Sequence, residues 1–295
     1  MTAPRPRAGA DRRALERAVA DDLGSREARW IVDDAAGPDA PPGVLSIEQA
    51  DRAHRLAERR ASGEPLQYVL GHWPFRELEL AVDPRALIPR PETEWLTDVA
   101  LVELDRLLAA GAAPLVVDLG TGTGAIALAV ATERSTHGIR VIATELDPDA
   151  LELATANRDR VALGHDAARA VELRQGSWWA ALDPADRGRI SLMVTNPPYV
   201  AALEWELLDP VVRDHEPYRA LVAGPGADAT PGFAEIETIL AGAGSWLARP
   251  GVAVIEIAPT QSAAALGAAE RFGVADATVL SDLAGRPRAL VARWG

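Results

Sequence analysis

The chain has 295 residues, of which 48% are hydrophobic, and a formal net charge of -13. This length accommodates one large domain and a small one, and no uninterrupted apolar stretch approaches the length of a membrane span. Residues 1–13 contain arginines without the apolar core of a signal peptide, so we expect a cytoplasmic protein without membrane contact. The absence of cysteine excludes disulfides, thiolate nucleophiles and Cys-ligated metals, and the five histidines show no metal-ligand spacing, so no metal site is expected.

The charge is unevenly distributed along the chain. All 30 basic residues are arginine; residues 1–75 contain 11 of them against 12 acidic residues, and the remainder carries a net charge of -12. An acidic catalytic portion is a poor electrostatic partner for a phosphate backbone. We therefore expect no direct nucleic-acid partner.

The first 70 residues predict a small helical bundle that serves as a structural or partner-docking module. Apolar residues recur at helical spacing over residues 11–23, and Ser25 is a candidate cap for a second helix. Ser46 and Gln49 have capping-box spacing for a third helix that ends near residue 62. Residues 71–90 follow as a connector containing a short hairpin, and residues 91–295 form the larger domain.

Residues 87–94 join the connector to this larger domain. Pro91 fits the first turn of a helix that extends to about residue 110, and acidic residues near its amino end suit the helix dipole. Arg90 and Glu92 are interpreted as capping and salt-bridging residues at the junction, and a role as walls of an active site stays open.

A glycine-rich turn follows the buried strand expected at residues 115–119 and precedes a helix at 125–132. Glycines let a backbone approach a ligand closely, and the start of a helix offers free N–H groups. Strand, turn and helix together predict a nucleotide-type cofactor site, although Gly120-x-Gly122-x-x-Ala125 also fits the loose fingerprint of a nicotinamide dehydrogenase. The turn consists of Gly120, Thr121, Gly122, Thr123 and Gly124.

The next two strands carry candidate contacts for the nucleoside part of that cofactor. A strand at residues 139–144 ends in Glu145, which is placed to accept both hydroxyls of a ribose. Asp147 competes for this role but fits better as the cap of the following helix. A third strand at residues 170–174 leads to Trp178 and Trp179; the first can stack on an adenine, and only one of the two is expected in the site.

The tetrapeptide Asn196-Pro197-Pro198-Tyr199 follows a strand predicted at residues 190–195. Two prolines cannot continue a central strand, so this segment forms a stiff turn at the carboxyl end of the strand, where open α/β sheets place their ligands. Free carbonyls and one Asn side chain can accept hydrogen bonds from a planar NH2 group.

Beyond the tetrapeptide, we expect a loop or short helix at 207–218 and a Gly/Pro-rich lid or irregular surface at 223–232. Helices are expected at 233–247 and 261–271, and strands at 251–258, 274–280 and 288–293.

Taken together, these motifs resemble the HemK/PrmC family, the release factor glutamine N5-methyltransferases, over about four-fifths of the chain. The resemblance implies a class I S-adenosylmethionine-dependent methyltransferase domain, an α/β fold with a Rossmann-like seven-stranded sheet, and a small N-terminal helical domain that helps to hold the protein substrate. It also implies that the acceptor is the glutamine of the Gly-Gly-Gln motif in class 1 release factors, that the product is S-adenosylhomocysteine, and that the enzyme is a monomer. The matching segments are residues 63–68, 88–94, 118–124, 196–199, 216–217 and 282–286.

The resemblance also assigns roles to single residues. The glycine turn would contact the methionine part of the cofactor, Glu145 the ribose and Trp178 the adenine. Asn196 and Pro197 would be the catalytic pair that holds the acceptor amide, with Asn196 also bordering the cofactor, and Pro198 and Tyr199 would complete the substrate site. The chain departs from the family pattern at Ser177, where an acid is usual, at Arg76, where an aromatic residue is usual, and in the longer segment 223–232.

Four alternative functions compete with this one. A nicotinamide dehydrogenase fits the glycine turn but leaves the Asn-Pro-Pro-Tyr turn unexplained. A sister activity, glutamine methylation of a ribosomal protein, uses the same motifs. N6-adenine methylation uses the same Pro-Pro-Tyr turn but requires base flipping and phosphate contacts, for which this acidic chain is poorly suited. A non-catalytic scaffold would have no use for the intact Asn196.

Overall fold

The computed structural model describes residues 10–38, 40, 43–111, 114–274 and 276–295. These residues divide into two compact units, one drawn from Met1–His72 together with Pro210–His215, the other from Trp73–Asp209 together with Glu216–Gly295. Within the described chain, no helix is long and apolar enough to cross a membrane.

The first unit is a helical bundle around its own apolar core, as the sequence predicts. Ser46 and Gln49 form the expected capping box at the start of the third helix. Ser25, expected as a cap, is instead the first residue of the second helix, because Gly24 adopts the turn between the two helices with a φ of 81°. The elements are β1 (Ala10–Asp11), α1 (Arg12–Leu23), α2 (Ser25–Ala36), β2 (Val44–Leu45), α3 (Ile47–Ala61), α4 (Leu66–Leu70) and α8 (Pro210–Arg213). The substrate-docking role of residues 1–70 stays a prediction.

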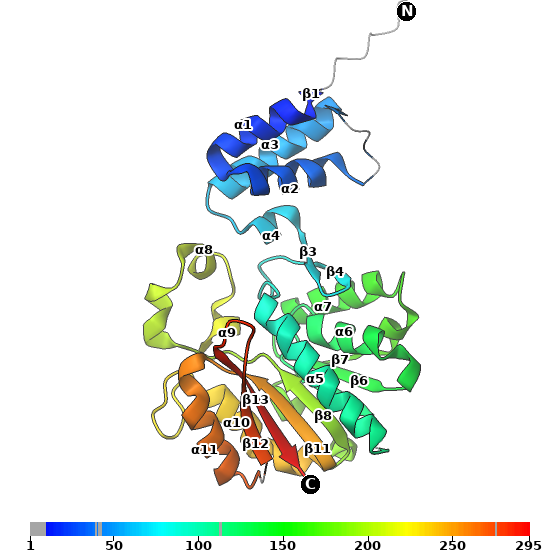
Figure 1. Ribbon diagram of the computed structural model, residues 1–295, viewed down its shortest axis with the longest axis vertical. Helices are drawn as coiled ribbons and strands as arrows, with labels where there is room; N and C mark the ends of the chain where they lie inside the picture. Colours follow the sequence, from blue (N-terminus) through cyan, green and yellow to red (C-terminus); the bar gives the residue numbers. More distant parts are fainter. Residues whose placement is uncertain (1–9, 39, 41–42, 112–113, 275) are drawn as a thin grey trace, which may run out of the picture. The chain divides into compact units, whose positions relative to one another are not determined.

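The second unit is built on a seven-stranded sheet with the order β12-β13-β11-β8-β5-β6-β7 (Figure 1). Strand β13 runs antiparallel to both of its neighbours, and the remaining neighbours pair in parallel. Every strand predicted for this sheet is present, with ends that differ by a few residues. The bounds are β5 (Leu115–Leu119), β6 (Arg140–Glu145), β7 (Glu172–Gln175), β8 (Ile190–Thr195), β11 (Leu247–Glu256), β12 (Asp276–Ser281) and β13 (Pro287–Trp294).

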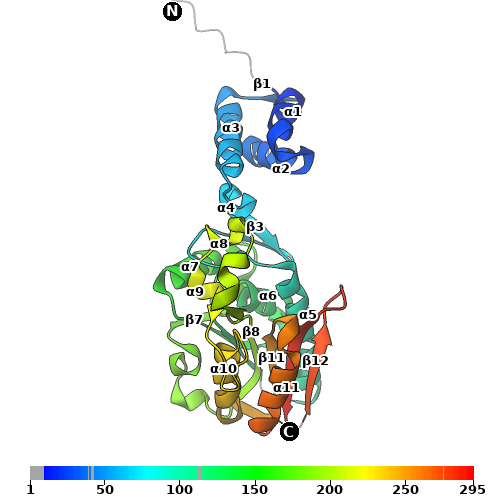
Figure 2. The ribbon, with the colours of Figure 1, turned by 90° about the vertical axis from the view of Figure 1, so that its left-hand side faces the viewer.

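Helices cover both faces of this sheet. One apolar core joins it to α5 (Pro91–Ala109), α6 (Ala125–Glu133) and the end of α7 (Pro148–Val161). A second core joins the opposite face to α10 (Ala234–Trp246) and α11 (Ser262–Arg271), which lie side by side (Figure 2). The sheet is thus doubly wound, as expected for an α/β fold that binds ligands at its strand ends.

Short elements complete the description. They are the hairpin β3 (His72–Phe75) and β4 (Leu78–Ala81), the parallel pair β9 (Val200–Ala201) and β10 (Val222–Ala223), helix α9 (Tyr218–Leu221), and single turns η1 (Ser135–His137), η2 (Asp166–Ala170), η3 (Trp178–Ala181), η4 (Pro184–Asp186), η5 (Ala202–Leu207) and η6 (Pro259–Gln261).

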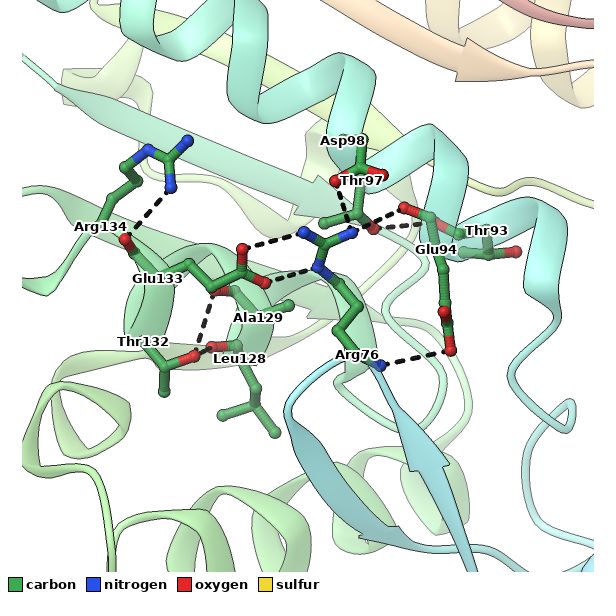
Figure 3. Close-up of polar contacts among 10 residues, drawn as sticks. All are labelled: Arg76, Thr93, Glu94, Thr97, Asp98, Leu128, Ala129, Thr132, Glu133 and Arg134. Atoms are coloured by element: carbon green, nitrogen blue, oxygen red, sulfur yellow. Dashed lines mark hydrogen bonds and ion pairs between the residues drawn. The ribbon is translucent and has the colours of Figure 1, made fainter. Parts of the chain in front are cut away.

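Arg76 ties the turn of the β3–β4 hairpin to two helices (Figure 3). Its guanidinium group donates to both carboxylate oxygens of Glu133 at 2.5 and 2.9 Å and lies 2.7 Å from Asp98. It also donates to the backbone carbonyl of Glu94, whose side chain accepts from the Arg76 N–H. Because the Arg76 side chain is only 15% exposed, this cluster fixes the start of α5 against α6 and the hairpin.

We predict that Arg76→Met destabilises the fold by about 2 kcal/mol, since it keeps the aliphatic stem but leaves the half-buried Glu133 carboxylate and the Glu94 carbonyl without their donor. Arg169→Met is the matched control, because Arg169 pairs with a side chain that is 98% exposed, and such a pair contributes at most about 1 kcal/mol. Urea denaturation of both variants measures the difference. Equal losses of free energy of unfolding would show that the Arg76 cluster contributes no more than an exposed pair.

Candidate functional site

The site lies where the order of the strands reverses. Strand β5 pairs in parallel with β6 on one side and with β8 on the other, so the segments after β5 and β8 leave the same edge of the sheet. The Thr195 hydroxyl, at the end of β8, donates to the Leu119 carbonyl, at the end of β5, at 2.6 Å. The glycine turn and the Asn-Pro-Pro-Tyr turn therefore begin next to each other, at the position where doubly wound sheets bind ligands.

A cavity of about 290 Å³ opens at this edge, a size close to the lower end of small-molecule sites. Among the residues predicted for the site, those that line it are Gly120, Thr121, Gly122, Thr123, Glu145, Trp178, Asn196 and Pro198. In the described chain, the lining does not include Gly124, Pro197 or Tyr199. It does include several residues that the sequence did not indicate, among them Arg85, Thr93, Arg219 and Glu235.

The glycine turn has a backbone that other residues rarely adopt. Gly120, Gly122 and Gly124 have φ angles of 70°, 55° and 85°. A Cβ atom on Gly120 would lie 3.0 Å from the ring of Trp178, and one on Gly124 would lie 3.2 Å from Leu128. Glycine is therefore required both by conformation and by close packing along the wall of the cavity.

Glu145 holds the turn in place from the neighbouring strand. One carboxylate oxygen accepts the Gly122 N–H at 2.9 Å, and the other accepts the N–H groups of Leu146 and Asp147 at 2.8 and 3.0 Å. Asp147 caps α7 through the Asp149 N–H, as predicted, and pairs with Arg219 at 3.1 Å. The carboxylate of Glu145 is thus fixed at the cavity wall as an acceptor.

Only one of the adjacent tryptophans lines the cavity, as expected. Trp178, with a φ of 44°, donates from its indole nitrogen to Glu235 at 2.7 Å. Trp179 is buried, stacks on Trp246 with ring centres 6.0 Å apart, and donates to the Ile239 carbonyl. Its neighbour Trp178 is therefore the aromatic wall.

The Asn-Pro-Pro-Tyr turn is held by buried polar groups on both sides. The Asn196 side-chain NH2 donates to the Thr93 hydroxyl at 3.0 Å, and the Tyr199 hydroxyl donates to Glu256 at 3.0 Å. The Tyr199 carbonyl accepts from the Gln261 side chain at 3.2 Å. The turn therefore has a fixed orientation, with Asn196 at the cavity.

The Gly/Pro-rich segment 223–232 packs against the same turn. A Cβ atom on Gly232 would lie 2.1 Å from the Tyr199 carbonyl oxygen, and Gln261 also donates to the Pro231 carbonyl at 3.0 Å. In the described chain, none of its residues lines the cavity, which favours the irregular-surface interpretation over a lid.

Arg90 combines both of the roles left open for it. It lines the cavity and pairs with the buried carboxylate of Glu216, which also accepts the Ile88 N–H at 3.2 Å. Glu92 instead pairs with Arg286 at 3.0 Å and, in the described part of the chain, is not among the lining residues.

Two buried acids lie behind the site. Burial raises the pKa of Asp118 to about 7. Hydrogen bonds from the Thr121 hydroxyl at 2.6 Å and the Ala127 N–H at 3.2 Å act in the opposite direction, because they stabilise the ionised carboxylate. Its Oδ1 atom is buried and has no hydrogen-bond partner among the described residues. Burial likewise raises the pKa of Glu256 to about 7. In the described chain, neither Asp118 nor Glu256 lines the cavity, so both acids support its walls from behind.

Sequence reasoning missed Thr93, Glu235 and Glu256. Glu256 carried a usable signal, because a single acid that ends the apolar run of β11 must be buried and so requires partners. Thr93 and Glu235 stand among other polar residues near helix starts, and no pattern distinguishes them from exposed neighbours.

Comparison with known proteins identifies the family. Residues 99–213 match the family model of the methyltransferase small domain. The chain is 35% identical to a release factor glutamine methyltransferase of Aliivibrio fischeri, over 86% of this chain and 82% of the relative. It is 40% identical to a protein of the same name from Streptomyces coelicolor, over 82% of this chain and 80% of the relative.

Among solved structures, the N-terminal domain of human METTL16 in complex with SAH matches with a TM-score of 0.51 at 14% identity, over 95% of this chain and 94% of that one. At this identity the likeness concerns the fold alone. The expected fold, a class I methyltransferase with a seven-stranded sheet, is confirmed.

We predict that Asp118→Asn flattens the dependence of stability on pH. The pKa of Asp118 rises on folding from 3.8 to about 7, so the folded state keeps a proton that the unfolded state releases. The wild-type free energy of unfolding therefore falls as pH rises between those two values. Asn keeps an acceptor for Thr121 but does not titrate, so the fall becomes shallower in urea titrations. Asp166→Asn, whose carboxylate is 98% exposed, is the control; a slope as steep in Asp118→Asn as in this control would contradict the prediction.

Proposed function

This chain belongs to the release factor glutamine methyltransferase family, and we propose that its cavity brings together S-adenosylmethionine and the glutamine side chain of the Gly-Gly-Gln motif in class 1 release factors. The product is a glutamine methylated on its N5 amide nitrogen. The observation that supports this most strongly is Asn196, which lines the same cavity as the glycine turn and whose NH2 group is already bound to Thr93.

The acceptor amide is the difficult partner in this reaction. Its nitrogen is a poor nucleophile because the lone pair is delocalised into the carbonyl group. We assign the Asn196 side-chain oxygen and the Pro197 carbonyl as acceptors for the two N–H groups of the substrate amide, which fixes the nitrogen and increases its electron density. Among the described residues, Asn196 and Pro198 line the cavity, whereas Pro197, between them, does not, so its carbonyl is the part of this assignment that the cavity supports least. Such orientation can contribute about 7–11 kcal/mol in favourable systems, so no dedicated general base is required.

The remaining wall fits the cofactor. When bound, S-adenosylmethionine supplies an electrophilic methyl group on a sulfonium. The turn from Gly120 to Gly124 approaches its amino-acid part, Glu145 accepts its ribose hydroxyls and Trp178 contacts its adenine. Thr121 and Thr123 belong to the same turn and line the cavity. Both donors of Thr121 are bound within the protein, the hydroxyl to Asp118 and the N–H to the Thr144 carbonyl, so this residue shapes the wall and fixes the turn. Ser177, which also lines the cavity, stands where the family usually has an acid, so Glu235 next to Trp178 supplies the negative charge on this side.

Of the alternative functions, glutamine methylation of a ribosomal protein uses the same geometry and differs only in the partner protein. N6-adenine methylation is disfavoured by the net charge of -13. A monomeric enzyme without direct nucleic-acid contact stays a prediction.

We predict that Asn196→Ala lowers kcat for release factor methylation about 100- to 1,000-fold, because the substrate amide loses an oriented acceptor. The dissociation constant of the cofactor, measured by calorimetry on the same preparation, stays close to that of the wild type. A variant that retains near wild-type turnover would remove Asn196 from the mechanism.

We predict that Glu145→Ala raises the dissociation constant of S-adenosylmethionine by about tenfold or more, because the carboxylate both accepts the ribose hydroxyls and supports the Gly122 N–H. Asp147→Asn, which keeps an acceptor for the α7 cap, is the comparison variant. Unchanged affinity in Glu145→Ala together with weakened affinity in Asp147→Asn would transfer the ribose role to Asp147.

A further inference from the structure

A chain of hydrogen bonds links Asn196 to a buried carboxylate that does not line the cavity within the described residues. The Asn196 NH2 group donates to the Thr93 hydroxyl at 3.0 Å, and this hydroxyl donates to Glu256 Oε2 at 3.0 Å. The other carboxylate oxygen, Oε1, accepts the Tyr199 hydroxyl at 3.0 Å. Thr93 and Glu256 are only 5% and 1% exposed, so water does not compete for these bonds.

The direction of these bonds follows from the chemistry of the groups. An ionised carboxylate can only accept hydrogen bonds, so both Thr93 and Tyr199 must donate to Glu256. The Thr93 hydroxyl has a single proton and gives it to Glu256, so it can only accept from Asn196. The Asn196 amide must therefore turn its NH2 group toward Thr93. Its oxygen then points away from Thr93, on the side available to a ligand in the cavity.

We propose that Glu256 is a positioning residue whose negative charge, relayed through Thr93, makes Asn196 present its oxygen rather than its NH2 group to the substrate amide. This inference rests on the proposed role of Asn196 as the acceptor for the glutamine NH2 group. It adds a second requirement to that role, namely that the orientation of the Asn196 amide is set from outside the cavity.

Protonation of Glu256 on Oε2 allows the chain to reverse, because Thr93 is then no longer forced to donate to the carboxylate. A protonated Oε2 donates to the Thr93 hydroxyl, which then has its own proton free to donate to Asn196. The Asn196 amide accepts this bond only after a half-turn that places its oxygen toward Thr93 and its NH2 group toward the cavity. Two NH2 groups then face each other, and the substrate amide loses its acceptor. The orientation of the Asn196 amide is thus enforced when Glu256 is ionised and is no longer enforced when Oε2 is protonated, so we expect lower activity in the protonated form.

The charges around Glu256 place this transition near neutral pH. Burial raises its pKa to about 7, while the hydrogen bonds from Thr93 and Tyr199 and the positive charge of Arg288 on β13 oppose the rise, and Glu92 on α5 adds to it. Tyr199 itself stays neutral, because burial and the charge of Glu256 raise its pKa, although Arg288 and Arg90 act in the opposite sense. The ionised form gains with rising pH, so kcat should increase through neutrality.

The test measures kcat and KM for a purified class 1 release factor at saturating S-adenosylmethionine from about pH 5.5 to 9. In the wild type, kcat falls toward acid pH with an apparent pKa near that of Glu256. We call this fall the acid limb of the pH profile. Glu256→Gln has nearly the same shape but cannot ionise, so Thr93 is no longer forced to donate to position 256. At alkaline pH, the kcat of this variant should be about a hundredfold lower than that of the wild type. Its pH profile should lack the acid limb, and its affinity for the cofactor should be unchanged. Glu103→Gln, which removes another buried carboxylate from the same unit, retains the acid limb.

Two substitutions in α5 test the relay itself. Thr93→Val removes the hydroxyl and should lower kcat as Glu256→Gln does, whereas Thr93→Ser retains the hydroxyl and should restore most of the activity. Thr97→Val is the matched control, because Thr97 is buried one turn further along α5 and donates only within the helix, to the Thr93 carbonyl at 2.8 Å (Figure 3). Thermal melting and calorimetric titration with the cofactor confirm that each variant is folded.

Measuring Asn196→Ala in parallel separates this proposal from the one on which it rests. An inactive Asn196→Ala with Glu256→Gln and Thr93→Val at wild-type kcat would overturn the relay and leave the acceptor role of Asn196 intact. Near wild-type turnover in Asn196→Ala would overturn both. An acid limb that persists unchanged in Glu256→Gln would also overturn the relay, because another group would then be responsible for it.

Discussion

The parallel pairing of β5 with β8 is the constraint on which the site depends. The two strands are far apart in the sequence, yet Val116 to Asp118 pair with Leu192 to Val194, and the Thr195 hydroxyl is bonded to the Leu119 carbonyl. This register places the ends of both strands at one edge of the sheet. The glycine turn and the Asn-Pro-Pro-Tyr turn can then form two walls of one cavity, which neither could form alone.

The main features of the fold could be predicted because they are local. Buried strands appear as short apolar runs, turns as glycine or proline clusters, and helix starts as capping residues, so the strands of the sheet and the helices around it were identified with ends shifted by a few residues. The glycine turn, Glu145 and Trp178 follow in the same way, because each ends a strand. Asn196 and Pro198 also follow a strand, β8. The four strands that these residues follow are successive neighbours in the sheet, which is why the residues meet at one cavity.

The hydrogen bonds that orient Asn196 and Tyr199 could not be predicted, because they join residues that are far apart in the chain. Asn196, Thr93 and Glu256 come from three separate elements, and only the packing of α5 against β11 and β8 brings them together. The Tyr199 hydroxyl bonds to that same carboxylate, a contact that the sequence of the turn does not indicate. Arg76 interrupts an aromatic position of the family pattern, and only the structure shows the acids that it joins.

The proposed activity of this cavity is methylation of the side-chain amide of a protein glutamine. The most direct measurement is incubation of the purified enzyme with methyl-labelled S-adenosylmethionine and a purified class 1 release factor, followed by peptide mass mapping. We expect one methyl group on the side-chain amide of the glutamine in the Gly-Gly-Gln motif. An unlabelled motif, with the methyl group found instead on a ribosomal protein or on adenine offered in the same reaction, would contradict it.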